Sequence, residues 1–514
     1  QVAGLTTGQV AALSAAQVQA METADVAALG ATQAQALSTA QVAALSTTGV
    51  SGLRTAQMAA LTTDQLVSLT TGSVATLTTT QLAALSTSQV RGISTAGVAA
   101  MTSTQTTTLS TTNLAALTTD QIKSLTTGNV STLGTTQVKA MTSDQIAVLT
   151  TAQLQSLSTS QVQAIDTADV AALTSNQIKA LSTSSLSGMT TTQVAALTSE
   201  QITSVATAAL AGMSTAQVAA LTTGQVAALG ATQVQALETA DVAVLSSTQA
   251  QALSTAQVAA LSTAQVQAIS TSGVTGLTTD AIKGLSNAQL QAITTAGVAA
   301  LTTTQVGALG TAQVAALTST EAAALTTTQV QAMSTAQVKA LEVGDLAAMT
   351  TAQVAALTTG QVSALTTGQV SSLTTGQVAA LTTSQVNVLS STQVQALGTS
   401  QVAALTTSQV AALTTSSVSA LSEADVRVLS TGQVNAISTS GVAVMSTTQV
   451  AALSTDQVAA FSTAQVSALT TTEAATLTAA QAKALTTAQV QALNTDNVKA
   501  LNLNSVKAMT TDQL

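Results

Sequence analysis

The sequence predicts an all-α solenoid, a superhelix of very short helices in which every eight residues form one helix. Three observations lead to this fold class: an unbroken eight-residue period, a helix-capping signature in most repeats, and a separation of acidic from basic residues within the repeat. A fixed short period over a long chain is typical of solenoids and arrays, in which each repeat contacts only its neighbours.

The period is defined by one large apolar residue at every eighth position from Leu5 to Met509. This anchor, octad position 1, is mostly Leu, and no insertion or deletion interrupts the series. Position 6 is mostly Val, position 8 is mostly Ala, Gly or Ser, and the consensus is L-[ST]-[ST]-x-Q-V-x-A. We interpret residues 1–514 as a single uninterrupted octad-repeat array. Because the chain starts and ends inside an octad, we expect it to be a window of a longer protein.

Positions 2 to 5 of the octad carry the signature of a helix start. In a capping box, S/T-x-x-Q, the hydroxyl accepts a hydrogen bond from the third helical residue and the Gln side chain reaches back to the N-cap. With the N-cap at position 2, the Gln at position 5 completes the box, and the anchor and Val form the hydrophobic staple of the same helix start. We therefore expect a helix of about six residues, roughly 9 Å long, in each octad.

The charged residues give an independent indication of helices. All 20 acidic residues fall at positions 2 to 5, and every basic residue except Arg54 falls at position 7. A helix dipole favours acidic side chains in the first turn and basic side chains in the last. Strands have only small net dipoles and give no comparable reason for this polarity. Exposure of these positions explains why they can carry charge, but not why the signs separate.

Two other folds compete with the short helices. In one continuous helix the Leu stripe would rotate by roughly 80° per octad and face no single partner. A β-solenoid remains the alternative because Thr and Val favour strands, although residues five apart point to opposite faces of a straight strand.

Helices this short are unstable alone, so successive coils must stack on one another. We expect the anchor and Val inside, and Thr, Ser, Gln and the position-7 side chains outside. Small residues at position 8 would let the backbones of neighbouring coils approach closely. The pattern predicts neither the number of octads per coil nor the handedness.

The composition removes most catalytic chemistry. The chain has no Cys, His, Pro, Trp or Tyr and a single Phe. Thiolate and imidazole ligands, Cys nucleophiles and Ser-His-Asp arrangements are therefore absent, and we predict no enzyme and no cofactor. The net charge of −9 argues against nucleic acid as a partner. No run of about 18 apolar residues occurs, so we predict no membrane insertion within these residues.

Paired carboxylates at positions 2 and 5 are the one constellation that could carry chemistry. Such pairs can work as acid and base or hold a calcium ion. They are Glu22 and Asp25, Asp166 and Asp169, Glu238 and Asp241, and Glu342 and Asp345. Because no Gly-rich calcium loop accompanies them, we interpret them as N-cap and third-residue partners of capping boxes. They remain only weak candidates for metal binding, and we predict no metal site.

The octad, as in LSTAQVAALSTAQVQAI from Leu253, resembles the octapeptide-repeat tracts of giant bacterial secreted or surface proteins of the adhesin-like kind. The resemblance covers the whole chain and implies an extracellular or cell-surface location. It brings no functional residues with it.

We predict a structural, non-catalytic protein that forms an extracellular fibre, a filament or a surface stalk by stacking of octads and lateral self-association. With only 6% charged residues, little repulsion keeps copies apart. The alternative function is a repetitive binding scaffold of a secreted adhesin, for surface glycans, weakly held cations or ice.

Overall fold

The computed structural model describes residues 1–514 and consists of one short 3-10 helix, Val2–Gly4, followed by the helices α1 to α63, with no strand. Most helices span five or six residues that start at octad position 3, as in α28 (Thr223–Ala228) and α49 (Ser391–Gln395). One short helix per octad confirms the predicted all-α solenoid, and the β-solenoid alternative has no support.

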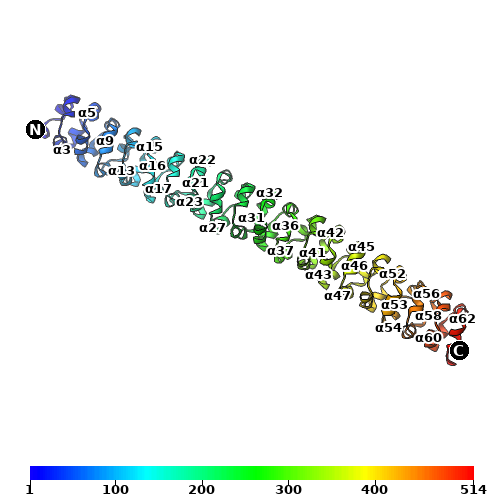
Figure 1. The fold of residues 1–514 in the computed structure, drawn as a ribbon. Helices are drawn as coiled ribbons and strands as arrows, with labels where there is room; N and C mark the ends of the chain where they lie inside the picture. Colours follow the sequence, from blue (N-terminus) through cyan, green and yellow to red (C-terminus); the bar gives the residue numbers. More distant parts are fainter. The chain divides into compact units, whose positions relative to one another are not determined.

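The chain divides by its internal contacts into two compact units, Gln1–Ala260 and Leu261–Leu514. The same octad builds each unit, and Figure 1 shows the short helices following one another within each. The interpretation of residues 1–514 as one array stays a prediction.

Within each unit, helices pack against the third helix along the chain. In the first unit α28 contacts α25 (Ser199–Ser204) and α31 (Ser247–Ala252), and in the second unit α49 contacts α52 (Thr415–Ala420). Three octads therefore complete one superhelical turn in each unit. The anchor and the position-6 residue are buried in almost every octad, as the sequence predicts.

Capping boxes start most helices, as the sequence predicts. In α49 the hydroxyl of Ser390 accepts a hydrogen bond from the backbone N–H of Gln393 at 3.2 Å, and the Gln393 side-chain oxygen accepts from the backbone N–H of Ser390 at 2.9 Å. The anchor and N-cap between two helices are extended, as at Leu229 (φ −56, ψ 137) and Gly230 (φ −71, ψ 157). This two-residue corner turns the chain, and no residue has a positive φ.

The expectation that Gln faces outward is wrong. Gln393 is only 3% exposed, and its side-chain nitrogen donates hydrogen bonds to the carbonyl oxygens of Val362 at 3.0 Å and Leu365 at 2.9 Å. Those two carbonyls lie at the end of α45 (Thr359–Ala364), at a corner of the preceding superhelical turn. We call this double contact, to its own N-cap and to the corner below, the Gln bridge.

The physical reason for the Gln bridge is that the last carbonyls of a short helix have no donor within that helix. Once turns stack, these carbonyls are buried and must be paired. A Gln amide supplies an acceptor for the N-cap and a donor for the carbonyls from one side chain.

Close approach at position 8 is confirmed. A Cβ atom added to Gly52 would lie 2.5 Å from Cγ2 of Thr23 and 2.9 Å from its carbonyl oxygen, which belong to the preceding turn. Position-7 side chains add exposed hydrogen bonds to the following turn. The side-chain amide of Gln163, for example, donates to the carbonyl oxygen of Gly188 at 2.6 Å.

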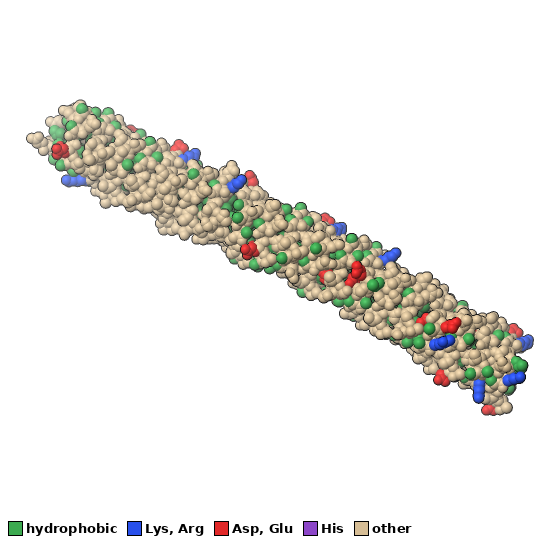
Figure 2. Space-filling model, in the orientation of Figure 1, with side chains coloured by type: hydrophobic (Ala, Val, Ile, Leu, Met, Phe, Trp, Pro, Cys, Tyr) green, Lys and Arg blue, Asp and Glu red, His purple; other side chains and the backbone are tan.

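The predicted polarity of charge along each helix is also confirmed. In α15 (Thr119–Ser124), Asp120 lies in the first turn and Lys123 in the last. The three ion pairs of the chain, such as Lys283 with Asp280 at 4.0 Å, join exposed side chains and contribute little to stability. Figure 2 shows sparse charges on a surface made mostly of uncharged polar side chains and backbone.

The identity of the anchor depends on position 5. Every β-branched anchor is followed four residues later by Gly, Ala or Asp and never by Gln; these anchors are Ile93, Ile165, Val205, Ile269, Ile293 and Ile437. A Cβ atom added to Gly97 would lie 3.0 Å from Cγ2 of Ile93, and one added to Gly441 would lie 3.0 Å from Cγ2 of Ile437. At these octads the β-branch lies close to the backbone of position 5 and leaves little room for a side chain there.

Replacing the buried Gln of a bridge should loosen the turns locally. We expect Gln393→Ala to lower the free energy of local opening around α49 by roughly 1–3 kcal/mol, because it leaves buried polar groups unpaired. Gln395→Ala is the matched control, since Gln395 lies in the same helix but is exposed, and we expect a change of less than about 0.5 kcal/mol. Amide hydrogen exchange measures both, and equal effects of the two variants would contradict the Gln bridge.

A double substitution tests the coupling between anchor and position 5. We expect Gly97→Gln alone to destabilise the first unit, because its Cβ would be crowded by Cγ2 of Ile93. Adding Ile93→Leu should recover the loss, and the two changes should couple by about 0.5–3 kcal/mol in a double-mutant cycle. Chemical unfolding followed by hydrogen exchange gives the four values. Additive effects would show that the pairing has no steric cause.

Candidate functional site

The paired carboxylates lie at the starts of four separate helices. Glu22 and Asp25 belong to α3 (Thr23–Ala28), Asp166 and Asp169 to α21 (Thr167–Ala172), Glu238 and Asp241 to α30 (Thr239–Ala243), and Glu342 and Asp345 to α43 (Val343–Ala348). In each pair the position-2 side chain is exposed, whereas the position-5 side chain is buried or half-buried. The structure brings no group of three or more Asp, Glu, His or Cys side chains together in a way that could hold a metal ion.

The capping roles of these pairs differ from the expectation. None of the four position-2 carboxylates makes a side-chain capping bond. The position-5 carboxylate does reach back in two pairs: Asp25 accepts from the backbone N–H of Glu22 at 3.3 Å, and Asp241 accepts from that of Glu238 at 3.1 Å.

Burial raises the pKa of two of these carboxyl groups, Asp241 and Asp345. Desolvation raises the pKa of Asp241, with a further rise from the charge of Glu238 opposed by the backbone hydrogen bond. Desolvation likewise raises the pKa of Asp345, while a hydrogen bond from the Ser319 hydroxyl at 2.9 Å lowers it and the charge of Glu342 raises it. The second carboxylate oxygen of Asp345, Oδ2, is buried without a hydrogen-bond partner.

Two glutamates also occupy the position of the bridging Gln and were not among the candidates. They are Glu321 in α40 (Ser319–Ala324) and Glu473 in α59 (Thr471–Thr476), and both are buried. Each accepts a hydrogen bond from its N-cap backbone N–H, at 2.7 Å from Thr318 and 2.6 Å from Thr470. The signal in the sequence is the replacement of Gln by Glu at position 5, which gains meaning only once position 5 is known to be buried.

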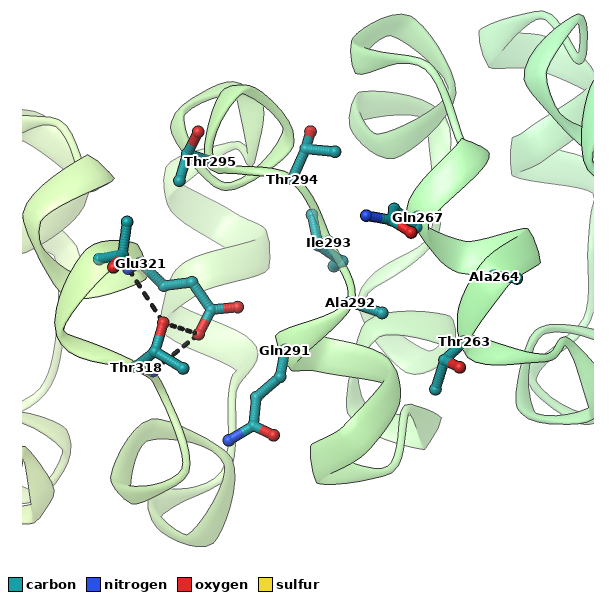
Figure 3. Close-up of a pocket in the computed structure, with 11 residues that line it drawn as sticks. Thr263, Ala264, Gln267, Gln291, Ala292, Ile293, Thr294, Thr295, Thr318 and Glu321 are labelled. Carbon is teal, nitrogen blue, oxygen red and sulfur yellow. Dashed lines mark hydrogen bonds between the residues drawn. The ribbon is translucent and has the colours of Figure 1, made fainter.

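The surface has shallow hollows between the helices of successive turns. One of about 490 Å³ is lined by residues of α33 (Thr263–Ala268) and α36 (Asn287–Gln291), by Ile293 and by Glu321 (Figure 3). Two others, near Asn387 and near Arg91, have volumes of about 390 and 370 Å³. The charged side chains that line them are Glu321 in the first hollow and Arg91 and Asp144 in the third.

Glu473 provides a test of burial at position 5. Desolvation raises its pKa, against the hydrogen bonds from Thr470 that lower it. Because the pKa of Glu473 is higher in the folded than in the unfolded chain, its protonation stabilises the folded state. This stabilisation is fully present below the unfolded pKa of about 4.3 and is lost as the pH rises through the folded pKa.

We therefore expect Glu473→Gln to raise the stability of α59 at pH 7 by about 1–2 kcal/mol, since an amide can donate to the corner carbonyls below. The advantage should shrink as pH falls towards 4, because the protonated carboxyl can donate as well. Exchange protection factors measured from pH 4 to 7 check this. The same pH dependence in both proteins would contradict it.

Comparison with known proteins identifies the repeat. No helix is long and apolar enough to cross a membrane, and no curated protein matches the sequence. Among solved structures, a homology model of the full-length AP-3 complex in an intermediate open conformation shares 11% identity over 99% of this chain and 84% of that one, with a TM-score of 0.16. A similarity at that level carries no argument.

The model of the ALTTAQ repeat matches this chain many times over, and the matches together cover well over half of it. The matched segments are residues 18–53, 39–71, 74–111, 114–151, 127–159, 147–183, 162–199, 170–207, 199–231, 234–271, 282–319, 338–375, 370–399, 378–415, 418–455 and 442–471. The chain belongs to the ALTTAQ repeat family.

Proposed function

We propose that this chain is a structural, non-catalytic protein of the extracellular space or cell surface, where it forms a fibre, a filament or a stalk. The observation that carries the proposal is the uniform surface of the solenoid. Turn after turn of each unit presents the same exposed Thr, Ser and Ala side chains, with few charges among them (Figure 2). Such repetition gives length and many equivalent contacts rather than one distinct site.

Lateral association of copies is part of this proposal. Exposed hydroxyls lie in pairs at positions 2 and 4, as in Ser390 and Thr392, whose oxygens are 3.0 Å apart. Rows of such groups can donate and accept hydrogen bonds with an identical surface. Low charge density leaves little electrostatic repulsion between copies. The adhesin-like resemblance of the octad supports the extracellular or surface location.

Electron microscopy of the purified chain is the first experiment. We expect filaments or bundles of constant width, formed by lateral contacts between copies. Separate particles at every concentration would mean that the repeats do not assemble and act as a spacer within a larger protein.

A charge series identifies the face that associates. Ala352, Gly376 and Ser400 occupy position 4 in three successive turns, all exposed. Replacing all three by Glu should preserve folding, because Glu200 already occupies this position elsewhere, and should disperse assemblies that use this face. Salt should restore association by screening the charges. Equivalent triple variants on the other two faces are the matched controls. If no face responds, lateral association through the octad surface is wrong.

A further inference from the structure

Glu321 interrupts the Gln bridge at one corner of the second unit. In the next octad, the Gln329 oxygen accepts from its N-cap, and its nitrogen donates to the carbonyl oxygens of Val298 at 2.9 Å, Ala299 at 3.2 Å and Leu301 at 2.6 Å. These carbonyls lie 31, 30 and 28 residues earlier in the chain. The same register from Glu321 leads to the carbonyls of Leu290, Gln291 and Ile293. Gln291 and Ile293 line the same hollow as Glu321.

The carboxylate of Glu321 can accept the hydrogen bond from the N-cap, but it cannot donate to carbonyl oxygens of the preceding turn. Its Oε2 accepts from the backbone N–H and the hydroxyl of Thr318, both at 2.7 Å, so this oxygen takes the place of the Gln oxygen. Its Oε1 takes the place of the donating nitrogen, but it is buried without a hydrogen-bond partner, in a residue only 3% exposed. Figure 3 shows this oxygen turned away from Thr318. An acceptor therefore stands where the corner needs a donor.

No cationic side chain offsets this charge. Glu321 takes part in none of the ion pairs of the chain. Helix α40 contacts α37 (Thr295–Ala300) and α43, and neither carries a basic residue. Helix α43 instead brings Asp345, whose Oδ2 is also buried and unpartnered. A buried charge without a partner is strongly destabilising, so the position calls for a counter-ion.

We propose that Glu321 binds a calcium ion through Oε1, together with the carbonyl oxygens of Gln291 and Ile293 and water from the hollow. The ligands are oxygen atoms of a carboxylate and of backbone carbonyls, which are the groups that calcium prefers. Calcium accepts irregular geometry and a shell partly made of water, whereas magnesium demands a near-ideal octahedron. The hollow of about 490 Å³ gives room for the ion and its water. The ion replaces the missing donor and links two turns.

This site is distinct from the paired carboxylates that the sequence offers, and it does not depend on self-association. Its expected effect is local. Calcium at ten times its dissociation constant should slow amide exchange in α36 to α40 (residues 287–324) about tenfold, because the ion binds only the closed form. Exchange in α44 to α48 (residues 351–387), where every position 5 is Gln, should not change.

Hydrogen exchange on the full chain, in chelator and then in calcium chloride, tests the proposal. Glu321→Gln should abolish the response and protect α36 to α40 without calcium, because the amide donates to the same carbonyls. Glu423→Gln removes an exposed acid of the same unit and should leave the response intact.

An unchanged exchange pattern in calcium, or an equal response in Glu321→Gln, would overturn the proposal. Protection that rises on acidification but not with calcium would also overturn it, because a proton on Glu321 would then supply the missing donor.

Discussion

The Gln bridge is the interaction on which the solenoid depends. A helix of five or six residues leaves most of its backbone groups without partners inside the helix, and stacking buries those groups away from water. One Gln side chain pairs unsatisfied groups of two successive turns. Gln393 accepts a hydrogen bond from the backbone N–H of its own N-cap and donates to carbonyl oxygens of the preceding turn. Helix initiation and turn stacking therefore rely on the same residue, which explains why Gln dominates position 5 without being a helix-capping residue of the usual Ser, Thr, Asp or Asn kind.

Variation at position 5 follows from the length and chemistry of the side chain. Asn and Ser are shorter but keep the bond to the anchor carbonyl, as Asn113 does to Leu85 at 3.0 Å and Ser505 to Leu477 at 2.6 Å. Gly has no side chain and cannot form this hydrogen bond. In four of the five octads with Gly at position 5, the anchor four residues earlier is β-branched. Asp and Glu keep the bond to the N-cap in several octads but lose the donor. Substitutions at position 5 therefore differ in which hydrogen bonds of the Gln bridge they keep.

Acidic residues at position 5 make single turns differ from the rest of a nearly uniform array. Glu321 and Asp345 lie on two helices in contact, and each has one buried oxygen without a partner. In a protein whose turns are nearly identical, a local departure of this kind gives a single turn a property that the others lack. A cation at this corner would make the stability of one segment depend on the calcium concentration, while corners with a Gln bridge would not respond. One chain would then combine a long, uniform solenoid with a segment whose stability depends on a bound cation.

The sequence by itself determined the local structure: one capped helix per octad, the anchor and Val as its buried residues, and the polarity of charge along the helix. These follow from contacts within eight residues, such as Ser390 with Gln393, and so leave a periodic signature. Only the tertiary structure decided that three octads make a turn and that Gln is buried. These depend on residues about three octads apart. The corner at Glu321 was hidden for the same reason, because its missing partners, Gln291 and Ile293, belong to the turn below.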